Sequence, residues 1–377
     1  MDRVIPLILA FVVSFTTVSS MAADNVVLVT LDGLRWQEVF RGYDPELINS
    51  EKFTEGKEHL LEKYDGNNNP IKREKLMPFV WHEMAEKGVV IGNRDKNSNM
   101  SVTNPWWFSY PGYNEILTGR ADPEINSNKA VANKNVTILE WLNTQSNFKG
   151  RVAAFGSWDV FPAIINAERA GIPVNAGFMP ADWRDLSQRA KFLNELQAQV
   201  PSPWDNVRLD AFTYGFAKEY LLAHKPRVLY ISLGETDDFA HDEQYHQYLN
   251  AANRADQLIA DLWQTLQSIP QYRNNTNLII TVDHGRGQTL ADWPHHASAR
   301  AVKEYFKDMA QFDQGIVGAD QIWFAAIGPD IKPLGEVSGG KEIYQDQVAA
   351  TVLRALGIDP KNYGTDIGTA IEQVLIK

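Results

Sequence analysis

Residues 25–33 read NVVLVTLDG, a continuous apolar run that ends in Asp32 and Gly33. A run with no alternation between apolar and polar residues indicates a strand that is covered on both faces. Further runs of this kind lie at residues 151–155 (RVAAF), 227–233 (RVLYISL), 277–282 (NLIITV) and 321–327 (QIWFAAI). Helical patterns separate these runs. We therefore predict an α/β fold with a mostly parallel central sheet and helices on both faces.

The most regular helical pattern covers residues 242–269, where apolar residues recur at alternating steps of three and four. This spacing indicates one buried stripe packed on the sheet, with a coiled-coil contact to a partner as the alternative. The sequence also predicts a helical piece near residues 186–200 and a last helix over residues 342–356.

The composition is that of a globular protein, with 44% hydrophobic and 22% charged residues among 377. The net charge of -11 argues against nucleic-acid binding, because neutralising a phosphate backbone requires clustered Lys and Arg. The absence of cysteine excludes disulfides, cysteine nucleophiles and cysteine-ligated metals.

The first residues have the pattern of a signal peptide. Arg3 gives a positive start, residues 4–18 are apolar, and small residues precede a cleavage site after Ala22. A membrane anchor is the alternative, but the apolar run is shorter than the roughly 20 residues that a span needs. We predict a signal peptide over residues 1–22 and a bacterial periplasmic or secreted protein without a membrane anchor after cleavage.

The remaining residues, 23–377, are predicted to form a single catalytic domain. Two polar or mixed segments, near residues 41–75 and 173–203, are interpreted as insertions into that domain.

Acidic residues and histidines follow three of the predicted strands. Asp32 follows the first strand, Asp237 lies shortly after residues 227–233, and Asp283 with His284 follows residues 277–282. A helix cap would explain one such carboxylate. The carboxyl ends of parallel strands meet at the ligand-binding edge of a sheet, so three strands that each end in a carboxylate favour a metal site there.

Histidine spacing supports this interpretation. Asp237 and His241 would share one face of a helical turn, although a helix cap beside a surface histidine explains that pair nearly as well. The stretch WPHHASAR adds His295 and His296. Carboxylates with imidazoles suit zinc, with manganese as the alternative ion.

Residues 104–119, NPWWFSYPGYNEILTG, contain the candidate nucleophile. Pro111 suits the first turn of a helix that ends near Gly119, which places Ser109 at a helix N-terminus that favours an anion. A purely structural helix cap is the alternative for Ser109. The surrounding Trp and Tyr rings could line a substrate pocket or belong to the core. Two divalent ions would balance three carboxylates and a deprotonated Ser109.

The ordered set of motifs resembles the alkaline phosphatase superfamily, and within it the nucleotide pyrophosphatase/phosphodiesterase branch and related bacterial phosphatases. The matching residues are Asp32-Gly33, Ser109 with Pro111, Thr118-Gly119, Asp237 with His241, and Asp283-His284-Gly285.

The resemblance implies an alkaline-phosphatase-like fold and two zinc sites. One would be formed by Asp32, Ser109, Asp283 and His284, and the other by Asp237, His241 and His296. His296 is preferred to His295 because its spacing from Trp293 resembles the W-x-x-H-G pattern of the family.

The resemblance further implies a two-metal hydrolase of small phosphoric esters, a phosphatase or phosphodiesterase, acting through a phosphoserine at Ser109. A sulfuric-ester hydrolase, a phosphomutase and a catalytically silent metal-binding relative remain alternatives. Where the diesterases carry a phosphoryl-binding Asn this chain has Ala130, and Asn128 is the nearest candidate. Arg35 and Arg286 are candidate cations for a monoester dianion.

Overall fold

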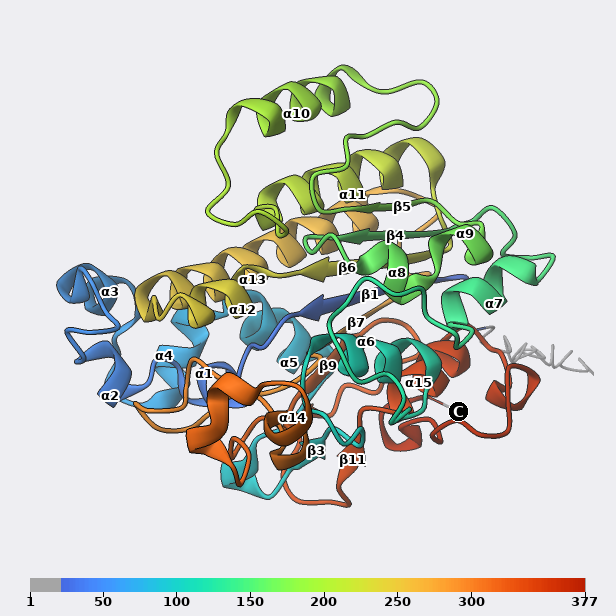
Figure 1. Cartoon of the computed structure of the whole chain (residues 1–377). Helices are drawn as coiled ribbons and strands as arrows, with labels where there is room; N and C mark the ends of the chain where they lie inside the picture. The colour runs from blue at the N-terminus through green and yellow to red at the C-terminus, as the bar shows by residue number, and fades with distance from the viewer. Residues whose placement is uncertain (1–21, 377) are drawn as a thin grey trace, which may run out of the picture.

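The computed structural model describes residues 22–376, so the predicted signal peptide lies almost wholly outside the described residues. An eight-stranded sheet forms the centre of the molecule, with helices on both of its faces (Figure 1). This architecture confirms the predicted fold class. The strands, in their order across the sheet, are β10 (Gly335–Glu336), β2 (Val89–Ile91), β9 (Phe324–Ile327), β7 (Thr276–Thr281), β1 (Asn25–Leu31), β6 (Val228–Leu233), β4 (Val152–Gly156) and β5 (Val174–Ala176).

The sheet is mostly parallel. Strand β1 lies between β6 and β7 and is parallel to both. Within the described sheet, only β9 runs antiparallel to its neighbours, β7 and β2. All residues of β1, β6 and β7 are buried, as the continuous apolar runs predict.

Two helical layers cover the sheet. The first contains α6 (Ser109–Thr118), α7 (Ile138–Thr144), α8 (Phe161–Ile165), α9 (Ala167–Ala170) and α15 (Gln347–Ala355). The second contains α11 (Asp210–His224) and α13 (Tyr245–Ser268), with α1 (Trp36–Arg41), α2 (Pro45–Ile48), α3 (Lys57–Tyr64), α4 (Asn69–Leu76), the π-helical turn Val80–Met84 and α5 (Ala85–Lys87) nearby.

The two segments interpreted as insertions contain defined elements. Residues 41–75 form α2, α3 and most of α4, which pack near α13. Residues 173–203 begin with β5, the edge strand of the sheet, and continue to α10 (Gln188–Gln199), which lies at the top of Figure 1 and packs on α11. None of the helices within residues 22–376 combines the length and apolar character needed to cross a membrane.

Three predicted boundaries differ from the structure. The run 321–327 is not one strand: β8 (Gln321–Ile322) joins β3 (Met100–Ser101) and β11 (Ile343–Tyr344) in a small second sheet, while β9 joins the main sheet. The helix predicted from residue 242 begins at Tyr245, because Glu243 has a left-handed backbone with φ +60°. The last helix begins at Gln347, because the residues before it pair with β3.

Candidate active site

The carboxyl ends of the three adjacent strands β7, β1 and β6 bring the candidate ligands together. Asp32 directly follows β1, and Asp283 with His284 follows β7 after a single residue. Strand β6 leads through Gly234 into α12 (Glu235–His241), which carries Asp237 and His241 on successive turns. Because these strands are parallel neighbours, their ends meet at one edge of the sheet, as the sequence pattern predicted.

One group of ligand atoms comes from Asp32, Asp283 and His284, which are all buried and offer atoms within 4.8 Å of one another. The Nε2 atom of His284 lies 3.3 Å from Asp32 Oδ1 and 3.3 Å from Asp283 Oδ2. Both carboxylate oxygens are buried and have no hydrogen-bond partner among the described residues.

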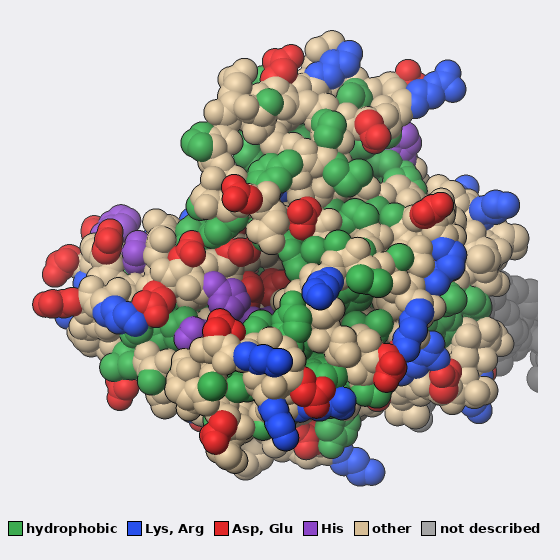
Figure 2. Space-filling model, in the orientation of Figure 1, with side chains coloured by type: hydrophobic (Ala, Val, Ile, Leu, Met, Phe, Trp, Pro, Cys, Tyr) green, Lys and Arg blue, Asp and Glu red, His purple; other side chains and the backbone are tan. Residues whose placement is uncertain are grey.

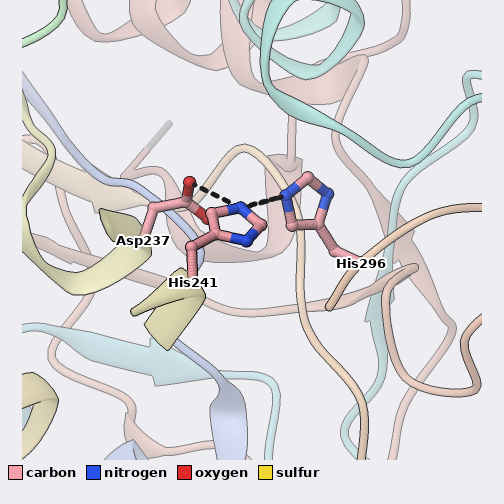
Figure 3. A group of neighbouring side chains, drawn as sticks. All are labelled: Asp237, His241 and His296. Atoms are coloured by element: carbon pink, nitrogen blue, oxygen red, sulfur yellow. Dashed lines mark hydrogen bonds and ion pairs between the residues drawn. The ribbon is translucent and has the colours of Figure 1, made fainter. Parts of the chain in front are cut away.

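The second group contains Asp237, His241 and His296, again with ligand atoms within 4.8 Å (Figure 3). The Nε2 atom of His241 lies 3.2 Å from Asp237 Oδ2 and 3.1 Å from Nε2 of His296. The neighbouring His295 is not in this group, and its ring packs instead against Phe312 with centroids 5.4 Å apart. Figure 2 shows histidine side chains beside recessed acidic side chains in the region of α12.

Outer contacts fix the protonated nitrogen of two imidazoles. His284 Nδ1 donates to the carbonyl oxygen of Gly285 at 2.9 Å, and His296 Nδ1 donates to the carbonyl oxygen of Trp107 at 3.3 Å. In the neutral rings Nε2 therefore keeps its lone pair and faces the ligand groups. Such a carbonyl contact on the distant nitrogen is typical of metal-binding histidines.

The electrostatics of the site are dominated by crowded carboxylates. Burial raises the pKa of Asp283 well above its usual value, and the charge of Asp32 raises it further. Burial opposes protonation of His284, but Asp283 and Asp32 outweigh it and raise the pKa of this imidazole to about 9. A pocket that holds a proton on a buried imidazole so strongly also attracts a divalent cation.

Arg286, one of the two proposed substrate cations, is buried and paired within the site. Its guanidinium contacts the carboxylate of Asp237. Burial acts to raise the pKa of Asp237, but Arg286 and His241 together outweigh it and hold this pKa well below the usual range. The other candidate, Arg35, is buried and paired with Glu38. Both arginines are thus engaged by carboxylates of this chain.

Ser109 is the first residue of α6 and follows Phe108, which occupies the N-cap position. Its Oγ atom lies 3.3 Å from His284 Nε2, so the hydroxyl faces the Asp32 group. The helix continues through Pro111 and ends at Gly119, which has the left-handed φ of +73°. The positive end of the helix dipole is therefore directed at the Ser109 hydroxyl, where it favours negative charge.

Two glycines allow the site to be this crowded. Gly33 has φ +57°, and a Cβ atom there would lie 2.7 Å from Asp237 Oδ1 and 3.1 Å from the His284 ring. A Cβ at Gly112, one turn into α6, would lie 2.4 Å from the carbonyl oxygen of Asp283. Helix α6 can approach Asp283 closely only because residue 112 has no side chain.

Most of the aromatic residues around Ser109 are buried, whereas Trp107 is only partly buried. Trp106, Phe108 and Tyr113 are almost fully buried. Trp106 and Phe108 pack in a small cluster with α14 (Ala299–Glu304). Trp106 and Phe108 therefore belong to the core.

Asn128 lies next to Ser109 in the fold, because its Oδ1 accepts a hydrogen bond from the backbone N–H of Tyr110 at 3.0 Å. This contact leaves Nδ2 of Asn128 as a remaining donor. The structure thus brings Asn128 beside Ser109 but does not itself assign it a substrate contact.

Sequence reasoning missed Tyr113 as a residue of this site. The hydroxyl of Tyr113 donates to Asp32 Oδ2 at 2.7 Å and accepts from Ser232 Oγ at 3.1 Å. Its position four residues after Ser109, one helical turn on, was an available signal, since such residues share a helix face.

The donor set fits divalent metal ions. Each group offers carboxylate oxygen and imidazole nitrogen, and two buried carboxylate oxygens lack any other partner among the described residues. Mixed oxygen and nitrogen donors of this kind suit zinc, and manganese is compatible with them.

The sequence profile of the family described as "Type I phosphodiesterase / nucleotide pyrophosphatase" matches residues 68–355, about three quarters of the chain. No curated protein sequence matches the chain.

Solved structures share the fold at low sequence identity. Alkaline phosphatase PafA aligns with a TM-score of 0.58 and 13% identity over 95% of this chain and 100% of that chain. The lipoteichoic acid synthase LtaP from Listeria monocytogenes aligns at 0.53 and 12%, over 92% and 76% of the two chains. The phosphonate monoester hydrolase SpPMH from Silicibacter pomeroyi aligns at 0.53 and 14%, over 92% and 76%. At these identities the likeness concerns the fold.

Proposed function

This chain belongs to the type I phosphodiesterase / nucleotide pyrophosphatase family of the alkaline phosphatase superfamily, and from that premise we propose that it hydrolyses small phosphoric esters with two bound zinc ions. The family consists of metal-dependent phosphoric-ester hydrolases. The number of ions, their identity and the covalent intermediate are parts of the proposal, with manganese as the alternative metal.

One observation carries the proposal. The Ser109 hydroxyl lies at the N-terminus of α6 and 3.3 Å from Nε2 of His284, beside two groups of carboxylates and imidazoles. The N-cap position of α6 is Phe108, so Ser109 does not occupy the cap position, and among the described residues its hydroxyl pairs with His284 rather than with the backbone of its own helix.

We assign the metal-binding roles by these groups. Asp32, Asp283, His284 and Ser109 would hold one ion, and Asp237, His241 and His296 the other. Bound divalent ions supply positive charge that favours an ionised serine and a developing phosphoryl charge.

The chain's own residues then act in two stages. Ser109 Oγ loses its proton to solvent and forms a bond to phosphorus while the bond from phosphorus to the leaving-group oxygen breaks, and that oxygen takes up a proton from solvent. Water next attacks phosphorus and gives up a proton, the bond from phosphorus to Ser109 Oγ breaks, Oγ takes up a proton, and the phosphoryl product is released. Asn128, with Nδ2 available beside Ser109, is proposed to donate to a phosphoryl oxygen.

The location and domain organisation are also proposals. We propose that residues 1–22 are removed as a signal peptide, that residues 23–377 act as one catalytic domain, and that the enzyme works in the periplasm or outside the cell. Mass spectrometry of the exported protein should find a mature N-terminus near Ala23, and retention of Met1 would contradict it.

The decisive test is Ser109→Ala. This change removes the nucleophile and leaves six protein ligands, so kcat should fall by orders of magnitude while zinc content and melting temperature stay near those of the unchanged protein. Ser98→Ala is a matched control, because Ser98 is also buried but its hydroxyl accepts only from the Gly92 N–H, away from the site.

The assay uses p-nitrophenyl phosphate, bis-p-nitrophenyl phosphate and p-nitrophenyl sulfate with the metal controlled. Near-normal kcat in Ser109→Ala would contradict the nucleophile assignment. Turnover of the sulfate ester alone would support the sulfuric-ester alternative. Metal binding without turnover of any ester would support a non-catalytic relative, and phosphate exchange between sugars would support a phosphomutase.

A further inference from the structure

The residues that precede the nucleophile, Thr103–Phe108, form a strap that is held by a buried carboxylate. Glu115 lies on α6 and has no exposed surface. One of its oxygens accepts from the hydroxyl and N–H of Thr103, at 2.7 and 3.0 Å. The other accepts from the backbone N–H and the side-chain Nδ2 of Asn104, at 2.8 and 2.9 Å. Glu115 therefore fixes the start of the strap to the same helix that begins with Ser109.

Asn104, held by Glu115, in turn restrains the middle of the strap. Its Oδ1 accepts from the backbone N–H groups of Trp106 and Trp107, each at 3.0 Å. Trp107 adopts the left-handed backbone with φ +57°. That conformation is unfavourable for a residue with a bulky side chain, so it persists only where neighbouring contacts hold it.

The left-handed turn at Trp107 is where the strap meets the second ligand group. The carbonyl oxygen of Trp107 accepts the Nδ1 hydrogen of His296 at 3.3 Å. Ser298 holds the strap from the other side, because its Oγ donates to the Pro105 carbonyl and its N–H to the Trp106 carbonyl. Nε2 of His296 is thereby left facing Nε2 of His241.

We propose that Glu115 and Asn104 are positioning residues: through Trp107 they set the tautomer and orientation of His296 and so link the nucleophile helix to the second ion site. The proposal rests on the proposed function in one respect, that His296 binds a metal ion. The side chains of Glu115 and Asn104, which form this relay to His296 through Trp107, do not touch the reacting atoms.

The chemistry of Glu115 supports this assignment. Burial raises its pKa to about 7, although hydrogen bonds from Thr103 and Asn104 act to lower it. No cationic side chain pairs with it in residues 22–376. Burying a carboxylate without a cation costs free energy unless hydrogen bonds compensate for it. Here the two oxygens of Glu115 accept from four N–H and O–H donors of Thr103 and Asn104, and the single oxygen of a glutamine could not accept from all four.

The experiment compares Asn104→Ala, Glu115→Gln and the double variant Asn104→Asp/Glu115→Gln. The double variant exchanges donor and acceptor between the two side chains and keeps the oxygen that receives the Trp106 and Trp107 N–H groups. Asp256→Asn is the matched control, because Asp256 is also a buried carboxylate with a pKa raised to about 7 by burial, and it accepts only the N–H groups of Phe79 and Val80.

Three measurements are made on the full mature chain. Nuclear magnetic resonance of ¹⁵N-labelled histidine rings in the metal-free protein reports which nitrogen of His296 carries the proton. Calorimetric titration with zinc reports the two binding events, and thermal unfolding reports stability.

We expect Asn104→Ala and Glu115→Gln to weaken the Nδ1–H preference of His296 and to lower the affinity of one zinc about 10-fold, the lower end for loss of an outer contact. The other zinc should change much less, and the double variant should recover part of the loss. The Asp256→Asn control should lower the melting temperature while leaving the His296 signal and both zinc affinities as they were.

The proposal would be overturned if the two single variants lost stability like the control but kept the His296 tautomer and both zinc affinities. It would also be overturned if both zinc affinities fell equally. The ring-proton measurement needs neither metal nor activity, so it tests the relay even if the unchanged protein binds no zinc, which would count against the proposed function instead.

Discussion

At the scale of single residues, the contact between Tyr113 and Asp32 explains how one oxygen of Asp32 stays free. The Tyr113 hydroxyl holds Oδ2, while Oδ1 has no partner among the described residues and faces His284. Tyr113→Phe should let the carboxylate turn, lowering zinc affinity at that group about 10-fold, with kcat/KM falling in parallel. Zinc titration and steady-state kinetics measure both.

Tyr272→Phe provides the comparison for that change. The Tyr272 hydroxyl is also buried, but it donates to the carbonyl of Pro226, remote from the ligand groups. Similar zinc affinities in the two variants would mean that Tyr113 does not orient Asp32.

Of the two adjacent histidines, His296 belongs to a candidate metal-binding group and His295 does not. His296 is buried against His241 and stacks on His284, whereas His295 packs on Phe312. His296→Ala should therefore remove more activity and more bound zinc than His295→Ala, as metal analysis and kinetics on both variants would reveal. The reverse order would shift the ligand assignment by one residue.

How far the sequence predicts the site depends on how directly the backbone delivers each residue. Asp32 and Asp283 follow their strands almost immediately, so knowing that the strands are parallel neighbours suffices to bring them together. Tyr113 and Arg286 were not recognised in these roles, because their contacts depend on the rotation of α6 and on the loop after β7. Those features are set by packing between distant segments.

At the scale of elements, the close approach of α6 to the end of β7 makes Gly112 a sensitive position. An alanine Cβ there would overlap the Asp283 carbonyl oxygen at 2.4 Å, so the helix or the strand end must move. Gly112→Ala should lower stability by about 1–3 kcal/mol, the usual range for overpacking, and should reduce kcat because Ser109 moves with the helix. Chemical denaturation and kinetics test this.

Gly215→Ala is the control on another helix, α11. A Cβ at Gly215 meets only the flexible Leu193 side chain, with its nearest atom at 3.0 Å, and alanine is the better helix former by about 1 kcal/mol. This variant should be neutral or stabilising with unchanged kcat. Equal behaviour of the two alanine variants would show that residue 112 is not a special contact.

The run 321–327 illustrates why element boundaries were harder to predict than element types. Its apolar residues correctly predict extended chain, but Trp323 lies between β8 and β9, which belong to different sheets. The Trp323 indole donates to the carbonyl of Leu34, a contact between residues remote in sequence. Local apolar patterning carries no information about which sheet a strand will join.

At the scale of the whole molecule, the fold class could be predicted because the central strands are buried on both faces. Strands covered on both faces read as continuous apolar runs, and the helices between them implied parallel pairing. The order of strands across the sheet and the small second sheet depend on long-range pairing of segments as short as two residues. Such short strands have no distinguishable sequence pattern.

The two ligand groups also join parts of the chain that are far apart in sequence, which makes metal binding a test of the whole molecule. They connect the ends of β1 and β7, helix α12 and the loop that carries His296. A ligand that binds only the folded chain stabilises it by about 2.7 kcal/mol per site at 100 times its Kd. Zinc added to chelated protein should therefore raise the melting temperature by several degrees and restore activity.

Two controls test whether the zinc-induced rise in melting temperature comes from this site: calcium in place of zinc, and the Ser109→Ala variant. Calcium prefers six to eight oxygen ligands, so two groups that contain one and two imidazoles should give calcium a much smaller shift in melting temperature than zinc. Ser109→Ala should keep most of the zinc-induced shift while remaining inactive, because six protein ligands remain. A melting temperature that does not respond to zinc, in protein that is nonetheless active after chelation, would contradict both the metal sites and the serine mechanism that depends on them.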